Sequence, residues 1–206
     1  MISALELAAN AFTAAAIVLA GRNNVHTWWT GIVGCTLFGA LYLQNHLYAD
    51  VTLQVFFVLT SVYGWWKWLR GAHGEPLPIT HATRATLGWT AGAGIAATLA
   101  YGTLLHATTD AYAPFPDSTV LVFSIIGQVL MMQRRVENWS FWVLVNTIAV
   151  PLYASRGLVL TSVLYAGFWV NAIVSWRNWR RLARAAAADS AADAFAPSSS
   201  TERLSS

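Results

Sequence analysis

The residues best suited to bind a small ligand lie between positions 139 and 153. Trp139, Trp142 and Asn146 follow i, i+3, i+7 spacing, which places them on one stripe of a helix, and Tyr153 extends the same face. Indole rings offer flat faces for stacking and attract delocalised cations, while an amide offers hydrogen-bond donors and an acceptor. The spacing therefore predicts a ligand-binding wall made of aromatic and amide groups.

Further amides interrupt apolar runs elsewhere in the chain, at Gln54, Gln128 and Asn171. A polar group inside a membrane is costly unless it meets a partner or faces a cavity. We therefore include these three residues among the candidate substrate-binding residues. The alternative is that they hydrogen-bond between helices and only stabilise packing.

Ionisable residues are placed differently, because acidic residues and histidines fall at the ends of apolar runs or between them. Glu6, near the start of the first run, comes closest to an exception. A transporter driven by protons or sodium usually needs such a group at depth. The chain also carries no Walker sequence, no HExxH motif and no spacing typical of a Ser-His-Asp triad. We expect no catalytic residue, no metal site and no cofactor.

The composition places these residues in a membrane. Of 206 residues, 56% are hydrophobic and 10% are charged, where a soluble domain has about 25% charged residues. The net charge of +3 reflects few acids, and the basic residues cluster at the ends of apolar segments. These features argue against a soluble enzyme and against a nucleic-acid binder. Cys35 is the single cysteine, so no intramolecular disulfide is possible.

Seven apolar runs are long enough, alone or with their flanks, to span a bilayer core that needs roughly 20 helical residues. They are Ala4 to Ala20, Trp28 to Leu47, Val51 to Trp66, Leu87 to Leu105, Ser118 to Met132, Trp139 to Tyr153, and Leu158 to Trp176. The first run lacks a basic segment before it, so we expect a retained helix and not a cleaved signal peptide.

The basic residues predict the orientation in the membrane, because short loops with basic residues stay in the cytoplasm. An outside N-terminus and a cytoplasmic C-terminus put eleven basic residues inside and only Arg156 outside, so we expect this orientation.

An internal repeat appears when the chain is shifted by 111 positions. The shift matches Trp28 with Trp139, Tyr42 with Tyr153, Trp65 with Trp176, Trp68 with Trp179, and Arg70 with Arg181. It lays the first run over the fifth, leaving one connecting run between two groups of three. We therefore predict an all-α polytopic membrane protein with seven transmembrane helices in a parallel 3+1+3 repeat, an arrangement also found in SWEET transporters.

This repeat divides the chain into four parts. They are a first three-helix repeat (1–70), a cytoplasmic loop with connecting helix 4 (71–107), a second three-helix repeat (115–181), and a disordered cytoplasmic tail (185–206). The arginines at the start of the tail, among them Arg177 and Arg181, could contact lipid headgroups or serve only as a topology anchor.

Residues that differ between the matched halves are candidates for binding an asymmetric substrate. Asn146 replaces Cys35, Trp142 replaces Gly31, Asn171 replaces Thr60, and Gln54 stands opposite Tyr165. Other tryptophans lie at the ends of runs, where such residues usually anchor a helix at the lipid headgroups. We assign that belt role to Trp28, Trp29, Trp65, Trp66, Trp68, Trp176 and Trp179.

Several motifs resemble the PnuC family of nicotinamide riboside transporters. In the first half they are the segment from Cys35 to Gln44, Leu-Tyr-Ala-Asp at 47–50, Leu-Gln-Val-Phe-Phe at 53–57 and Tyr-Gly-Trp at 63–65. In the second half they are Asp117-Ser118, the segment 132–139 ending in Glu-Asn-Trp, then Trp142, Asn146 and Asn171. The resemblance extends from Trp28 to Trp179.

The resemblance implies a SWEET-like fold in the bacterial inner membrane, a homotrimer, and uptake of a vitamin by facilitated diffusion. Trapping would follow from phosphorylation by a cytoplasmic kinase. At the positions that match the family motifs, the resemblance implies that the ligand contacts are Gln54, Trp139, Trp142, Asn146 and Asn171. It also implies that Asn138 caps or gates the sixth helix.

We therefore predict a nicotinamide riboside facilitator that works by alternating access and is not an enzyme. A thiamine or riboflavin carrier of the same family is the main alternative, because no residue in the sequence separates these substrates. A sugar carrier and an intramembrane enzyme are the alternatives from other classes.

Overall fold

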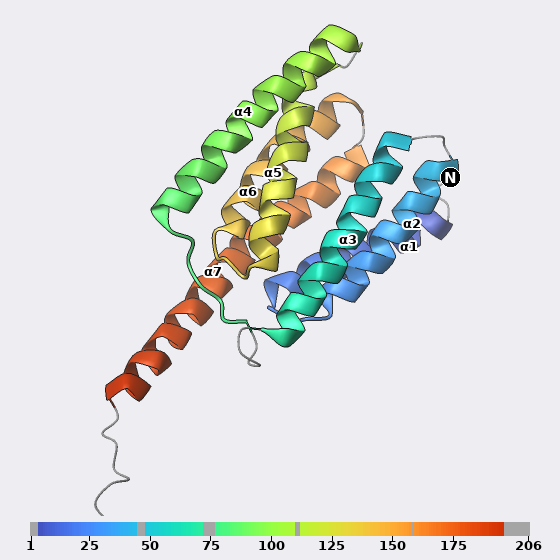
Figure 1. The fold of residues 1–206 in the computed structure, drawn as a ribbon. Helices are drawn as coiled ribbons and strands as arrows, with labels where there is room; N and C mark the ends of the chain where they lie inside the picture. The colour runs from blue at the N-terminus through green and yellow to red at the C-terminus, as the bar shows by residue number, and fades with distance from the viewer. Residues whose placement is uncertain (1–3, 45–47, 72–76, 110–111, 158, 196–206) are drawn as a thin grey trace, which may run out of the picture.

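The computed structural model describes residues 4–44, 48–71, 77–109, 112–157 and 159–195 (Figure 1). Within these ranges the chain is helical apart from its turns and the non-helical segment 77–83, in which Thr80 forms one isolated bridge pair with Arg135. The seven helices are α1 (Ala4–Gly21), α2 (Thr27–Gln44), α3 (Tyr48–Arg70), α4 (Arg84–Thr108), α5 (Pro114–Met132), α6 (Asn138–Ser155) and α7 (Val159–Phe195). Each predicted apolar run thus corresponds to one helix.

The helices pack as two groups of three with α4 outside them. Within each group neighbours in the chain are neighbours in space, so α2 packs on α1 and α3, and α6 packs on α5 and α7. Between the groups, α1 packs on α7 and α3 packs on α5, while α4 contacts only α5 among the described helices (Figure 1). Exchanging α1, α2, α3 for α5, α6, α7 reproduces this set of contacts, with α4 alone left over.

The turns that end α1 and α5 have the same backbone geometry at positions 111 residues apart. Asn23 and Arg134 adopt left-handed conformations, with φ of 53° and 51°. The next residue then bonds back in the same way, since Asn24 N donates to Leu19 O and Arg135 N donates to Leu130 O, both at 2.9 Å. Each turn reverses the chain so that α2 and α6 begin beside the ends of α1 and α5.

Two of the described helices, α1 and α5, are long and apolar enough to cross a membrane by length and composition, with mean hydropathies of 1.6 and 1.5. The others carry more tryptophan, tyrosine, threonine and glycine. Large apolar side chains nevertheless stay exposed on the outside of several helices, among them Leu59, Trp89 and Val163. Such faces suit contact with lipid better than contact with water.

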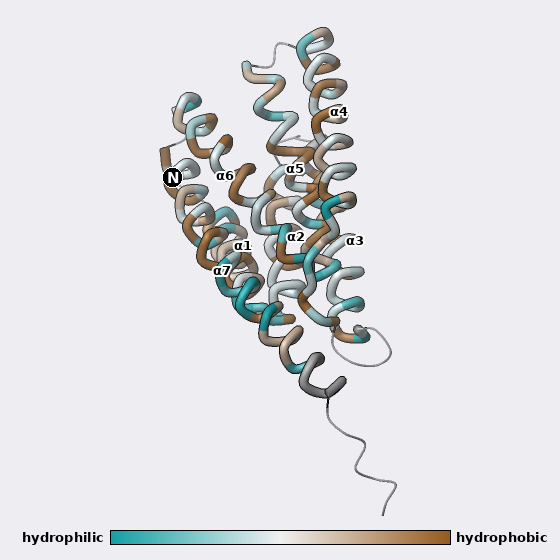
Figure 2. Tube along the Cα trace, turned by 90° about the vertical axis from the view of Figure 1, so that its left-hand side faces the viewer, coloured by the Kyte–Doolittle hydropathy of each residue, from teal (hydrophilic) through white to brown (hydrophobic). Residues whose placement is uncertain are grey.

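The C-terminal segment differs from the prediction of a disordered tail at 185–206. Helix α7 continues to Phe195, and residues 196–206 lie outside the described part of the chain. The reason is local, because residues 183–188 include five alanines, the residue of highest helix propensity. Figure 2 shows hydrophobic residues along the helices of the bundle and hydrophilic residues gathered where α7 leaves it.

Candidate functional site

A cavity of about 570 Å³ lies at the centre of the helices and receives side chains from all seven of them. Six residues predicted to bind substrate line it: Gln54, Gln128, Trp139, Trp142, Asn146 and Tyr153. Three different helices, α3, α5 and α6, supply these six side chains. The structure therefore brings together residues that are up to 99 positions apart in the sequence.

The aromatic and amide wall predicted on α6 faces this cavity. Trp142 packs against α5, where a Cβ atom added at Gly127 would lie 3.1 Å from its indole ring. Asn146, one turn further on, donates from Nδ2 to the Trp142 carbonyl at 2.8 Å, and its Oδ1 has no hydrogen bond within the described residues. An indole face and an amide oxygen are thus placed side by side on one helix.

Two glutamines add polar groups from other helices. Gln54 of α3 and Gln128 of α5 both line the cavity, and neither side chain forms a hydrogen bond with another described residue. Gln128 is buried in the bundle. Because buried polar groups normally have partners, these two amides are available to a ligand or to water.

Four tryptophans form a cluster at one end of the cavity, and two of them, Trp28 and Trp139, line it. The Trp28 and Trp68 rings meet edge to face at 5.2 Å, and the Trp139 and Trp179 rings do so at 5.6 Å. The two pairs are 111 positions apart, and Trp68 joins them by contacting Trp179 at 5.9 Å. We call Trp28, Trp68, Trp139 and Trp179 the tryptophan floor.

Indole hydrogen bonds fix this floor to the ends of α1 and α5. Trp179 Nε1 donates to Ala20 O at 3.1 Å, and Trp68 Nε1 donates to Met131 O at 3.3 Å. The two donors are 111 positions apart in the sequence, and so are the two acceptors. The belt role predicted for Trp28, Trp68 and Trp179 is wrong, since all three are buried. Tryptophans of a membrane belt and tryptophans of this floor both lie at the ends of apolar runs, so their position in the sequence could not distinguish the two roles.

Trp28 is a cavity residue that the sequence prediction missed. It lines the cavity with its partner Trp139, and the indole Nε1 of each is buried without a hydrogen-bond partner in the described structure. The shift of 111 that pairs Trp28 with a predicted ligand residue was the available signal. Two donors without partners beside a cavity suit a ligand that carries acceptor atoms.

The opposite end of the cavity holds tyrosines and one ion pair. The rings of Tyr153 and Tyr165 lie 4.9 Å apart, and Tyr42 lines the same cavity. Asp117 also lines it, although the sequence placed this residue among the helix ends and loops. It lies in the first turn of α5 and accepts a 2.5 Å bond from Arg156 Nη2. That bond raises the pKa of Arg156, so its guanidinium stays charged at neutral pH.

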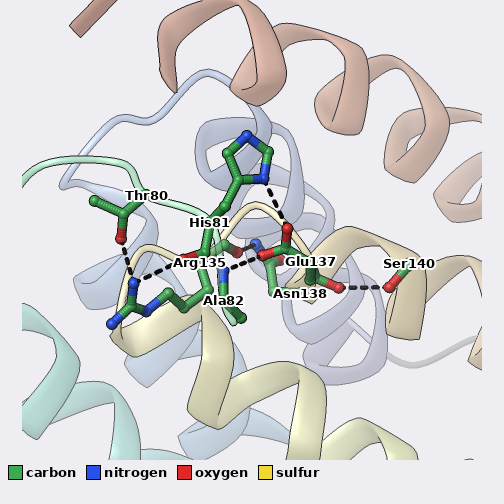
Figure 3. A network of polar contacts seen from close by, with 7 residues as sticks. All are labelled: Thr80, His81, Ala82, Arg135, Glu137, Asn138 and Ser140. Carbon is green, nitrogen blue, oxygen red and sulfur yellow. Dashed lines mark hydrogen bonds and ion pairs between the residues drawn. The ribbon is translucent and has the colours of Figure 1, made fainter. Parts of the chain in front are cut away.

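Beneath the floor, residues 77–83 cross the turn between α5 and α6 and are fixed to it (Figure 3). Glu137 accepts from Ala82 N at 2.8 Å and lies 2.7 Å from His81 Nδ1. Arg135 Nη1 donates to Thr80 Oγ1 at 2.7 Å. We call this set of contacts the loop clamp.

Arg134 links the loop clamp to the floor. Its guanidinium lies 4.1 Å from the centroid of the Trp68 ring and donates to Leu77 O. Burial lowers the pKa of Arg134 to about 10, which still leaves it protonated at neutral pH and able to make a cation–π contact. The clamp is asymmetric, because it is built on the α5–α6 turn and not on the equivalent α1–α2 turn.

Two of the predicted residues lie outside the cavity. Asn138 is buried and donates from Nδ2 to Arg135 O at 2.6 Å, so it fastens the turn before α6. The N-cap position belongs to Glu137, without a side-chain capping bond. Asn171 donates to Ile17 O at 3.3 Å and joins α7 to α1, as in the packing alternative.

Comparisons with known proteins agree with this architecture. The model of the family described as nicotinamide mononucleotide transporter matches residues 3–181. The nicotinamide riboside transporter PnuC of Escherichia coli K12 is 29% identical over 195 residues, covering 82% of this chain and 81% of the relative. The riboflavin/roseoflavin transporter RibM of Streptomyces davaonensis is also 29% identical, over 170 residues, covering 79% and 78%.

A solved structure shares the fold. It is described as the crystal structure of the vitamin B3 transporter PnuC, and it aligns with a TM-score of 0.69 at 23% identity, covering 87% of this chain and 82% of that one. All these relatives are transporters by name and none is named as an enzyme. The resemblance to the PnuC family and the prediction of a non-enzyme are thereby confirmed.

Proposed function

Since this chain belongs to the nicotinamide mononucleotide transporter family, a family of helical membrane proteins, we propose that it carries nicotinamide riboside by facilitated diffusion. The relatives support transport of a vitamin, and the choice among vitamins is our proposal. We place the protein in the bacterial inner membrane with its N-terminus outside and its C-terminus in the cytoplasm.

The observation that carries the proposal is the composition of the cavity. Its wall combines the indole faces of Trp139 and Trp142 with the amides of Gln54, Gln128 and Asn146. Asp117 is the only formally charged side chain among the described lining residues, and Arg156 neutralises it. Nicotinamide riboside presents a flat cationic ring and sugar hydroxyls, which need aromatic faces and amide partners and no buried carboxylate.

We propose alternating access by rocking of α1–α3 against α5–α7. The matched turns at Asn23 and Arg134 and the matched indole bonds of Trp68 and Trp179 support a parallel repeat with two similar halves. Substrate would enter at the tyrosine end while the tryptophan floor is closed, and would leave after the floor opens. The absence of an unpaired carboxylate among the described cavity residues favours a carrier without ion coupling.

Two further parts of the proposal concern partners. Phosphorylation of the product by a cytoplasmic kinase would trap it and make uptake effectively one-way, because a facilitator only equilibrates its substrate. The family resemblance also supports a homotrimer as the assembled form.

Riboflavin is the second candidate substrate, and a specific observation favours it. RibM is 29% identical to this chain, the same identity as the Escherichia coli PnuC. A thiamine carrier is the third, because thiamine has a cationic ring like nicotinamide riboside.

Titration calorimetry on the purified protein in detergent would test the substrate. We expect nicotinamide riboside to bind, with riboflavin and thiamine giving no saturable heat under the same conditions. Saturable binding of riboflavin or thiamine alone would overturn the substrate and leave the carrier proposal standing. A proteoliposome assay with unmodified product recovered inside would exclude an enzyme, and accumulation above the outside concentration without a kinase would contradict facilitated diffusion.

A further inference from the structure

A second hollow of about 470 Å³ lies between α1 and α7, at the end of the bundle where α1 stops. Three arginines line it: Arg22 from the turn after α1, and Arg177 and Arg181 from consecutive turns of α7. None of the three forms an ion pair within the described residues, whose ion pairs are His81 with Glu137 and Arg156 with Asp117. Three like charges around one hollow repel each other unless an anion lies among them.

The carbonyl groups at the end of α1 accept hydrogen bonds from other side chains than these arginines. α7 supplies other donors, since Asn178 Nδ2 bonds to Gly21 O at 3.0 Å and Trp179 Nε1 bonds to Ala20 O. The end of α1 carries a partial negative charge of about one half, which is much smaller than three positive charges. The guanidinium groups therefore remain available to an external anion with several oxygens.

The hollow continues into an apolar surface toward the middle of the helices. Val18 and Val174 line it and are 40% and 58% exposed. One turn further along α7, Val170 is also exposed. Charged and apolar parts in one groove, oriented along the bundle axis, match a molecule with an anionic head and a hydrocarbon chain.

Helix ends alone do not create this arrangement, as the other half of the molecule shows. A shift of 111 positions places Gln133, Trp66 and Arg70 where the groove has Arg22, Arg177 and Arg181. At these three positions the equivalent seam between α3 and α5 keeps one arginine, and Arg134 at the same end is already engaged by Leu77 O and the Trp68 ring. Because topology anchoring needs only basic residues at helix ends, it does not require three of them around one hollow.

We propose that the groove between α1 and α7 binds an anionic phospholipid, with its phosphate among Arg22, Arg177 and Arg181 and an acyl chain along Val18 and Val174. The bound lipid would contact both α1 and α7 at the seam between the two halves. This proposal does not depend on which vitamin the cavity carries.

Thermal unfolding of the purified protein in a neutral detergent tests it. Added dioleoyl phosphatidylglycerol should raise the Tm of the unmodified protein by about 5 °C, since a ligand that binds only the folded state stabilises it. Dioleoyl phosphatidylcholine and inorganic phosphate should each give less than about 1 °C by the same relation. The variant R22Q/R177Q/R181Q should lose the phosphatidylglycerol shift.

The variant R84Q/R180Q/R184Q is the matched control. It removes three positive charges from exposed positions that do not line the groove, so we expect it to keep the phosphatidylglycerol shift. Native mass spectrometry provides a second readout if the groove variant is less stable, because its retained lipid can be counted on folded protein. Equal loss of the shift in both variants would overturn the site. A shift with inorganic phosphate as large as with phosphatidylglycerol would replace the lipid with a soluble anion and overturn the proposal.

Discussion

Substitutions of Trp142 and Asn146 can test ligand binding without disturbing the tryptophan floor. Both line the cavity on α6, whereas Trp139 on the same face also packs into the tryptophan floor. Replacing Trp139 would therefore change the floor and the ligand wall together. Trp66 on α3 serves as a comparison, because its ring is 51% exposed and lies outside the cavity.

We predict that Trp142→Ala and Asn146→Ala each weaken binding of nicotinamide riboside by about 10- to 100-fold, the range expected for losing a desolvated cation–π or hydrogen-bond contact. Trp142→Phe should retain much of the affinity, because it keeps an aromatic face. Calorimetry gives the dissociation constants, with Trp66→Ala expected to stay within about twofold as an exposed surface change. Equal losses at positions 66 and 142 would mean that the cavity wall is not the binding site.

Sequence reasoning found six of the cavity residues, among them its three amides, and misjudged the surroundings of several tryptophans. Gln54 and Gln128 were identifiable because an amide in an apolar run is costly unless it has a partner or faces a cavity. The residue type gave no such signal for Trp28 and Trp68, because lipid and a helix interface are both apolar surroundings for an indole. For Trp28 the available signal was the shift of 111 that pairs it with Trp139, and for Trp68 only the contacts between helices separate the two cases.

At the scale of helices, the two indole hydrogen bonds connect elements that the chain does not place next to each other. Trp68 joins α3 to the end of α5, and Trp179 joins α7 to the end of α1. The matched residues follow from the shift of 111, but the sequence did not reveal these bonds. The repeat predicted which residues are equivalent but not which residues they contact.

We predict that Trp68→Phe and Trp179→Phe destabilise the protein by similar amounts, about 0.5–1.5 kcal/mol each, because each removes one of the two hydrogen bonds that the carbonyl of Met131 or of Ala20 accepts. Thermal or denaturant unfolding in detergent would measure the change. Trp89→Phe is the control, since Trp89 of α4 is 83% exposed and should change stability by less than about 0.5 kcal/mol. A loss confined to one of the two floor positions would contradict their equivalence.

The loop clamp offers a second test at this scale. Glu137 holds residues 77–83 through His81 and the backbone of Ala82. We predict that Glu137→Ala speeds amide hydrogen exchange in a peptide that covers residues 77–86, because the Ala82 amide loses its acceptor. Glu137→Gln, which keeps one acceptor oxygen, should give a smaller increase. Unchanged exchange in both variants would show that the other contacts of the turn are sufficient to hold the loop.

Helix positions were predictable to within a few residues, since apolar runs and polar breaks determine them. The end of α7 was not, because its polar and alanine-rich composition is compatible with either a helix or a disordered tail. Disorder was predicted from 185, whereas the helix reaches Phe195. Alanine propensity favours the helix once the bundle has already nucleated it.

For the whole molecule, the seams between the two groups of helices are the places where the alternating access that we propose would act. α1 meets α7 on one side and α3 meets α5 on the other. The α1–α7 seam is very close at Gly21, where an added Cβ would lie 3.1 Å from Ser175 Cβ. By contrast, α1 and α2 belong to one group, and an added Cβ at Gly31 would lie 3.8 Å from Ala16 Cβ. A disulfide has a mean Cβ separation of about 3.8 Å, so both pairs can be bridged after small shifts.

We predict that a disulfide in Gly21→Cys/Ser175→Cys abolishes transport and that reduction restores it, because this bond joins the two groups that rock against each other in the proposed cycle. The pair Ala16→Cys/Gly31→Cys bridges helices within one group. Because both positions line the cavity, the control compares this variant only with itself, and its rates before and after reduction should be equal. Both variants need Cys35→Ser as background, to remove the single native thiol. Uptake of labelled nicotinamide riboside into proteoliposomes, with and without reductant, gives the ratio for each variant. Undiminished transport with the first pair fully oxidised would mean that α1 and α7 move together, and rocking of one group against the other would then be the wrong description of the cycle.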